Sequence, residues 1–349
     1  MVSVLVRRTV PLALAGALVT ALPGRALAEP PPGQWVPAAT PALAAPAALH
    51  GVTAPNRRAA WVVGSEAGAT VPVVLRWNGT AWDRQAVPAG TAPELVDVDA
   101  RGPANAWAVG QSANPADVRA LRWNGRAWRA VPYPLAKPLG VSVDSGGTAW
   151  SVGCTESDCA VLQRQGGDWV RHDPGISPSA IAARTPHDVW AGGTGGPLAR
   201  YDGTAWTPVP LPGQWPHWVL QILPLAANDV WVYTLPFDPL FSGPRVLHWD
   251  GTTWTEHQPP PPSSLQQVGA LADDPGFLGG IASDGRGGLW LQTNRDTYYH
   301  HFDGTTWTRV PRTQPIPTRP TMYGLAQIGN TRSLWAAGHG PTPLIERFR

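Results

Sequence analysis

Trp107–Gly110 reads WAVG and Leu121–Trp128 reads LRWNGRAW, and together they form one unit that recurs along this chain. The first half centres in turn on Trp61, Trp107, Trp150, Trp190, Trp231, Trp290 and Trp335. The second half also occurs at Leu75–Trp82 and, with drift, before Trp169, Trp206, Trp254 and Trp307. Successive copies lie roughly 40 to 60 residues apart, which is the period of a β-propeller blade. The repeat therefore predicts an all-β, seven-bladed propeller.

The second unit predicts four antiparallel strands per blade. Alternating apolar and polar residues favour a half-buried strand in its first segment. The predicted strands are Leu95–Asp99, Trp107–Gly110, Val118–Trp123 and Ala127–Val131. Asn124-Gly125 predicts a hairpin of type I′ between the last two, because both central positions of that turn need positive φ.

The two ends of the repeat predict how the ring closes. Seven copies of the first half accompany only six complete hairpins. The chain stops at Leu344–Phe348, where the third strand of the last blade is expected, and Gly33–Pro37 reads as an unpaired fourth strand. Joining the two completes the seventh blade and removes an exposed sheet edge.

The first residues are typical of an export signal. Arg7 and Arg8 precede the apolar run Val10–Leu22, and Ala26-Leu27-Ala28 fits a signal-peptidase site. The apolar run is too short to span a membrane. We therefore expect residues 1–28 to be a signal peptide, residues 29–349 to be the propeller, and the mature protein to be secreted and extracellular, without membrane insertion. Whether export follows the general or the twin-arginine route stays open.

Charge argues against a nucleic-acid partner. The formal charge of +2 includes Arg7, Arg8 and Arg25, and without these three leader residues it becomes −1. Phosphate binding needs clustered Lys and Arg, and this chain scatters its arginines and has almost no lysine.

Two cysteines, Cys154 and Cys159, stand close together in GCTESDC. In an exported protein this pair predicts one disulfide, worth roughly 2 kcal/mol by the loop-entropy model. A redox pair or a metal site is the less favoured interpretation, because the spacing is not C-x-x-C and no further thiol is present.

Seventeen of the nineteen tryptophans occupy repeat positions, so we expect them to pack between neighbouring blades. The other two lie in the segment Leu211–Trp218, which we interpret as a connection between blades. A second off-repeat segment, Tyr233–Pro244, follows in the next blade, and the two should meet on one face. Their candidate ligand-binding residues are Trp215, His217, Trp218, Phe237, Asp238 and Phe241. Such a cluster suits a sugar ring, and the alternative is that the loops pack on each other or cap the centre of the ring.

A second candidate patch belongs to blade six. It comprises Asn294, Arg295, Asp296 and Tyr298, for which a solvated loop is the plainer interpretation. His300 and His301 are neighbours on a predicted strand, where alternate residues face opposite ways, so no metal site is expected. We expect no cofactor.

Recognised catalytic motifs are missing from the chain. It contains no G-x-S-x-G elbow, no H-E-x-x-H and no phosphate-cradling glycine loop. We therefore expect a non-catalytic recognition module. The alternative is a polysaccharide hydrolase or lyase, which predicts a convergent acidic pair on one face. A structural role in the cell envelope is a third possibility.

Over residues 29–349 the chain resembles secreted seven-bladed propeller lectins of filamentous bacteria, through its WAVG and WNGTAW halves and its export signal. It looks especially similar to the lectin subunits of umbrella toxin particles. That resemblance implies recognition of a cell-surface glycan, docking onto an adaptor protein, and assembly on a large toxin scaffold.

Overall fold

The computed structural model describes residues 33–213, 216–237, 244–260, 279–293, 298–314, 321–340 and 342–349. The chain divides into two units, Met1–Gly33 and Gln34–Arg349, and the second holds every strand discussed below. Among the described residues all regular structure is β, in seven four-stranded antiparallel sheets. No described segment forms a helix with the length and apolar character of a membrane span.

Seven sheets form the blades, numbered here from the innermost strand outward. Blade one contains β2 (Ala48–Asn56), β3 (Ala59–Glu66), β4 (Val71–Trp77) and β5 (Trp82–Arg84). Blade two contains β6 (Glu94–Ala100), β7 (Ala106–Gln111), β8 (Ala120–Trp123) and β9 (Trp128–Val131). Blade three contains β10 (Lys137–Val143), β11 (Ala149–Cys154), β12 (Cys159–Gln165) and β13 (Asp168–His172). Blade four contains β14 (Pro178–Thr185), β15 (Asp188–Gly193), β16 (Leu198–Tyr201) and β17 (Trp206–Val209). Blade five contains β18 (His217–Ala226), β19 (Asp229–Pro236), β20 (Arg245–Trp249) and β21 (Trp254–His257). Blade six contains β22 (Gly280–Ser283), β23 (Leu289–Gln292), β24 (Tyr298–Phe302) and β25 (Trp307–Pro311). Blade seven contains β26 (Thr321–Gln327), β27 (Leu334–His339), β28 (Pro343–Phe348) and β1 (Trp35–Pro37).

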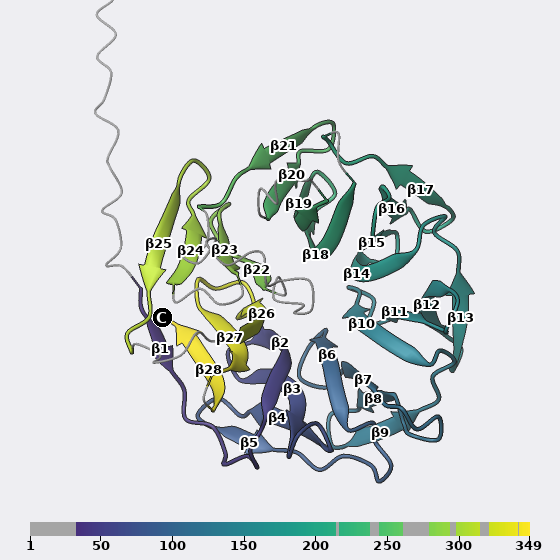
Figure 1. Cartoon of the computed structure of the whole chain (residues 1–349), viewed down its shortest axis with the longest axis vertical. Coiled ribbons are helices and arrows are strands. Elements are labelled where there is room, and N and C mark those ends of the chain that lie inside the picture. The colour runs from purple at the N-terminus through teal and green to yellow at the C-terminus, as the bar shows by residue number, and fades with distance from the viewer. Residues whose placement is uncertain are drawn as a thin grey trace, which may run out of the picture. The chain divides into compact units, whose positions relative to one another are not determined.

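The sheets close into a ring (Figure 1). Each innermost strand contacts the innermost strand of the next blade, in the order β2, β6, β10, β14, β18, β22, β26 and back to β2. The predicted closure is confirmed, because β1 pairs with β28 through Trp35–Phe348, Val36–Arg347 and Pro37–Glu346. The seven-bladed propeller predicted from the repeat is therefore the observed fold.

The hairpin predicted at Asn124-Gly125 forms, and an equivalent one forms at Asn78-Gly79, but the predicted turn type was wrong. The loop from β4 to β5 has four residues, and only Gly79 has positive φ, at 107°. The Asn78 side chain stabilises the turn, since its Oδ1 accepts bonds from the backbone N–H groups of Thr80 (2.8 Å) and Ala81 (3.0 Å). Asparagine and aspartate therefore act here through side-chain capping rather than through a left-handed backbone.

The repeat tryptophans form the core between blades, as expected. The central tryptophan of each blade is at most 4 % exposed. In six of the seven blades it pairs with an aromatic ring from the outer half of the following blade: Trp169 lies 5.5 Å from Trp107 and Trp82 lies 5.0 Å from Trp335, between ring centroids. Edge-on contacts of this kind stabilise beyond the area they bury.

A cation or polar group lies opposite the central tryptophan on the third strand of every blade. The cross-strand partners are Arg76, Arg122, Gln163, Arg200, His248, His301 and Arg347. The Arg122 guanidinium carbon lies 5.6 Å from the Trp107 ring centroid, and that of Arg347 lies 5.2 Å from the Trp335 centroid. These are cation–π pairs at equivalent sites.

A buried ion pair joins blade seven to blade six. Arg312 pairs with Glu346, which also accepts a 2.6 Å hydrogen bond from the Tyr299 hydroxyl. Glu346 and Tyr299 are fully buried, and Trp35 stacks on Tyr299 with centroids 3.7 Å apart. The terminal strand is thus fixed by packing and charge as well as by its ladder.

Candidate functional site

Four of the ten predicted ligand-binding residues are described by the structure: His217, Trp218, Phe237 and Tyr298. The other six lie outside the described residues: Trp215, Asp238, Phe241, Asn294, Arg295 and Asp296. Residues 1–28, which we predict to be a signal peptide, also lie outside them. We call the face at which the innermost strands begin the loop face. It carries the connections between blades and those between second and third strands.

The described parts of the two off-repeat segments meet on the loop face, as the sequence predicts. The backbone N–H of Phe237 donates a 2.9 Å hydrogen bond to the carbonyl of Pro216. Phe237 follows β19 directly, and its side chain is 42 % exposed. An aromatic ring is therefore available to solvent where these two segments join.

The placement of His217 and Trp218 in a connection was wrong, because both residues belong to β18 and pair with Pro236 and Leu235. His217 is 7 % exposed, its Nδ1 lies 2.9 Å from the Thr234 hydroxyl, and its Nε2 lies 3.0 Å from the Pro212 carbonyl. Since both ring nitrogens have partners inside the protein, His217 holds the connection in place. Trp218 is half-buried beside it.

Blade six places Tyr298 at the start of β24, with 36 % of its side chain exposed. The two histidines that follow face opposite ways, as expected. His300 is fully buried, whereas His301 lies 4.6 Å from the Trp290 ring centroid and bonds Asp284 at 2.9 Å. Within the described parts of the chain, no three His, Cys, Asp or Glu side chains are placed to hold a metal ion.

A feature that the sequence analysis missed recurs near the start of six innermost strands. Each has a β-bulge, an extra residue that interrupts its register with the second strand. The six bulge residues are His50, Val96, Leu139, Ser179, Leu220 and Tyr323. All six are partly exposed. Bulges re-aim side chains and occur often beside active sites, so these residues form an equivalent set around the ring axis.

Two bulge residues from neighbouring blades join a polar cluster on the loop face. His50 and Tyr323 have ring centroids 4.8 Å apart, and His339 at the end of β27 lies 5.7 Å from Tyr323. Glu94, the first residue of β6, places its Oε1 3.4 Å from His50 Nε2. We call His50, Glu94, Tyr323 and His339 the bulge cluster. Its residues come from blades one, two and seven.

The protein shifts the ionisation of these groups. Burial, with a smaller contribution from His339, lowers the pKa of His50 to about 4. Burial also lowers the pKa of His339 and, together with the Glu94 carboxylate, raises the pKa of Tyr323. Perturbed groups that converge from several elements are the usual mark of a functional site. At neutral pH the cluster presents two neutral imidazoles, a neutral phenol and one carboxylate that is 38 % exposed.

Two further carboxylates on β6 have a different role. Asp97 accepts hydrogen bonds from the backbone N–H groups of Val98 and Val141, each at 2.8 Å. Asp99 likewise accepts one from Val143 at 2.7 Å, so both bridge blade two to blade three. Burial raises the pKa of Asp97 to about 7 and raises that of Asp99. Because their oxygens are occupied by the backbone, we assign these residues to holding the ring together.

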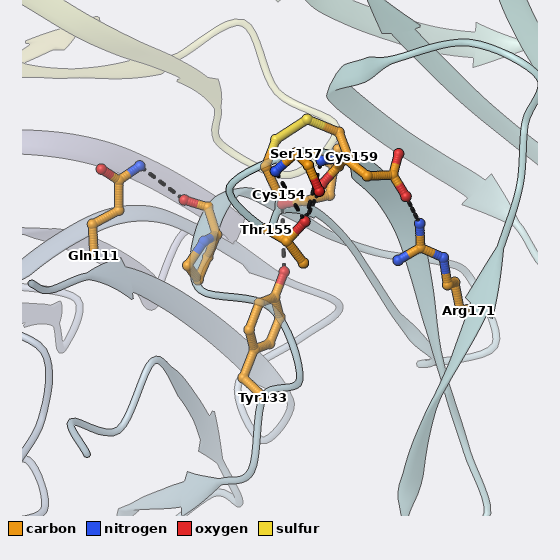
Figure 2. Close-up of a disulfide and its surroundings, with 10 residues drawn as sticks. Gln111, Tyr133, Cys154, Thr155, Ser157, Cys159 and Arg171 are labelled. Carbon is orange, nitrogen blue, oxygen red and sulfur yellow. Dashed lines mark hydrogen bonds and ion pairs between the residues drawn. A yellow bond between two sulfur atoms is a disulfide. The ribbon is translucent and has the colours of Figure 1, made fainter. Parts of the chain in front are cut away.

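The predicted disulfide is confirmed (Figure 2). Cys154 and Cys159 are bonded, and their Cα atoms are 3.9 Å apart as a direct pair across β11 and β12. The bond closes a short hairpin on the loop face. Inside it the Thr155 N–H donates to the Asp158 carbonyl at 2.8 Å, and the Asp158 side chain pairs with Arg171. The bridge therefore stiffens one loop of blade three.

Comparison with known proteins supports the fold. No family model matches the chain, and no curated protein is significantly similar in sequence. Among solved structures it is similar to YCF48 bound to D1 peptide, with 15 % identity, a TM-score of 0.61, and coverage of 92 % of this chain and 97 % of that one. It is also similar to YCF48 from Cyanidioschyzon merolae, with 16 % identity, a TM-score of 0.60, and coverage of 90 % of this chain and 99 % of that one. A third similar structure is virginiamycin B lyase from Staphylococcus aureus, with 11 % identity, a TM-score of 0.62, and coverage of 91 % of this chain and 99 % of that one. At these identities the similarity supports the propeller fold of this chain, and it does not identify a ligand.

Proposed function

We propose that this chain is an exported recognition module that binds a glycan on its loop face, with the bulge cluster as the centre of the site. The observation that carries the proposal is the convergence of His50 and Tyr323, two bulge residues on adjacent strands. In the described blades two to five the equivalent positions hold Val96, Leu139, Ser179 and Leu220. Three of these four residues are apolar and Ser179 is small, so among the described bulge residues only His50 and Tyr323 bring two polar rings together.

The chemistry of the cluster suits a neutral polyhydroxylated ligand. A neutral imidazole offers one donor and one acceptor, a tyrosine hydroxyl offers both, and Glu94 accepts. Sugar hydroxyls need such partners, and their C–H faces pack on aromatic rings. Phe237 and Tyr298 are exposed aromatic residues on the same face, in blades five and six.

The similar structures support recognition only in a general sense. One of the similar structures is YCF48 bound to D1 peptide, so a scaffold of similar fold serves binding there. The resemblance to umbrella-toxin lectin subunits supplies the more specific expectation of a cell-surface glycan, an adaptor and a large toxin scaffold.

A glycan array probed with the full secreted protein tests the proposal. We expect selective binding that falls tenfold or more in Tyr323→Phe and His50→Gln. His248→Gln is the matched control, because His248 is a partly exposed histidine that stacks on Trp231 in blade five. Silence across the array, or equal binding by all four proteins, would contradict the proposal.

A second candidate function is cleavage of a polysaccharide. The observation that favours it is the pairing of His50 with Glu94 at 3.4 Å beside Tyr323, a set able to move protons. Incubation of each bound polysaccharide with wild type and His50→Gln, followed by assay for new reducing ends or unsaturated products, separates the two functions. Products that depend on His50 would replace the binding proposal with an enzymatic one.

The proposed assembly needs its own test. An affinity pull-down of the tagged protein from native culture supernatant, identified by mass spectrometry, should recover a small adaptor and a large repeat-bearing protein. Recovery of the propeller alone would contradict the toxin-particle assignment and leave the glycan site to be judged on the array.

A further inference from the structure

A cavity of about 370 Å³ lies where blade seven meets blade one. Its volume falls within the range of small-molecule sites, about 300–1,000 Å³. We call it the closing-blade pocket. Its lining includes Ala39, Trp77, Trp82, Trp335, Arg347 and Arg349. The hairpin between β4 and β5 contributes to it, so the pocket lies away from the loop face.

Three indole rings lie at its inner end, where 8 % of Trp77, 4 % of Trp82 and 1 % of Trp335 is exposed. Trp335 lies 5.0 Å from both Trp77 and Trp82, and these two lie 5.7 Å from each other, between ring centroids. The same kind of packing recurs between other blades, where Trp123 and Trp128 pair with a 5.9 Å separation. At the closing blade, however, the segment that follows β1 leaves the rings beside a cavity.

Positive charge gathers beside these rings without an acidic partner. Arg347 stacks on Trp335 at 5.2 Å, and Arg349 also lines the pocket. Burial and repulsion from Arg349 and Arg57 together lower the pKa of Arg347. None of the three arginines forms an ion pair with a described residue. By contrast Arg200, the equivalent of Arg347 in blade four, bonds Asp188 at 2.9 Å.

We propose that the closing-blade pocket binds a carboxylate-bearing sugar residue, such as a uronic acid. The sugar ring would lie along residues 38–41, against the exposed edges of Trp77 and Trp82, and its carboxylate would pair with Arg347 and Arg349. Arginine–carboxylate bonds are charge-assisted and directional. The site is separate from the bulge cluster, and its existence does not depend on what the loop face binds.

Binding of digalacturonate to the full-length protein tests this site, with the carboxyl-reduced neutral disaccharide as the comparison ligand. Calorimetric titration should show the acid bound at least tenfold more tightly than the neutral sugar. Arg347→Gln should weaken binding tenfold or more, whereas Arg122→Gln should not. Arg122 is the matched control because it stacks on Trp107 in blade two and lines no part of this pocket.

A second variant guards against a fold defect in Arg347→Gln. Ala39 is an exposed lining residue, so Ala39→Trp should fill the cavity, abolish digalacturonate binding and leave the melting temperature unchanged. His50→Gln should bind digalacturonate as wild type does, which keeps this test distinct from that of the loop face. Equal affinity for the acid and neutral sugars, or undiminished binding by Ala39→Trp, would overturn the proposal.

Discussion

His50 and Tyr323 meet across the boundary between blades one and seven, with ring centroids 4.8 Å apart and planes inclined at 57°. Each is the extra residue of a β-bulge in an innermost strand. A bulge directs a side chain out of the regular alternation of a strand. The contact therefore follows from the same local irregularity in two adjacent blades.

Acid should destabilise the protein through His50. The folded chain holds this imidazole neutral down to a pKa of about 4, whereas an unfolded histidine protonates below about 6.5. Between these values the unfolded state binds more protons, so stability is lost as the pH falls from about 6.5 to about 4. Because one pKa unit corresponds to about 1.4 kcal/mol, the loss amounts to about 3 kcal/mol at most.

Urea unfolding at pH 7.5, 6.5, 5.5 and 4.5 measures this effect as the difference between wild type and His50→Gln. Subtracting the two free energies of unfolding cancels the contribution of groups that both proteins share. One of these is Asp97, whose raised pKa makes stability fall as the pH rises toward 7, opposite to the effect of His50. A difference that stays constant over the four pH values would show that His50 is not held neutral.

Phe237→Ala should separate binding from folding. The side chain is 42 % exposed, so its loss should change the free energy of unfolding by about 0.5 kcal/mol or less. Affinity for the array glycan should fall, since the exposed ring is a candidate platform for the sugar. Thermal unfolding and a glycan titration on the same preparation check both parts. A large drop in melting temperature with unchanged affinity would assign Phe237 to the scaffold.

Trp107→Ala should behave in the opposite way. Trp107 is 2 % exposed and packs against Trp169 of the next blade and Arg122 of its own. Truncation of a buried aromatic residue costs about 3–5 kcal/mol. Chemical denaturation should show this loss, and a cost below about 1 kcal/mol would mean that the inter-blade tryptophans are not the main core.

Glu346→Ala should weaken closure of the ring. It removes the buried carboxylate that pairs with Arg312 and accepts the Tyr299 hydroxyl bond, and breaking a buried ion pair costs about 3–5 kcal/mol. Arg171→Ala provides the control, because Arg171 and Asp158 are 48 % and 61 % exposed in their pair, which should contribute about 1 kcal/mol or less. Similar unfolding curves for the two variants would contradict a special role for the buried pair.

Much of the fold could be predicted because the same tryptophan and turn residues recur at equivalent positions of each blade. Trp35–Pro37 was recognisable as a fourth strand from its position relative to Leu344–Phe348, and the structure pairs the two. The four-residue turn at Asn78 was not foreseen, because the same Asn-Gly pair serves both a two-residue turn and a side-chain cap. His217 was misplaced for a related reason: β18 begins earlier than the repeat suggests, and its hydrogen bonds to Thr234 and Pro212 become visible only in three dimensions.

The bulge cluster was harder to predict, since a bulge depends on how one strand registers with another. A weak signal did exist in the spacing. His50, Val96, Leu139, Ser179 and Leu220 each stand eleven residues before the central tryptophan of their blade. Tyr323 stands twelve before Trp335, and nothing in the linear sequence shows that it meets His50.

The most direct test of the central claim is calorimetric titration of the strongest array glycan into wild type and into the double variant His50→Gln, Tyr323→Phe at pH 7.5. We expect saturable binding by wild type, recovery of the glycan intact, and an affinity at least tenfold lower for a double variant that still unfolds cooperatively. Equal affinity in a folded double variant, or release of cleaved product by wild type, would contradict recognition through the bulge cluster.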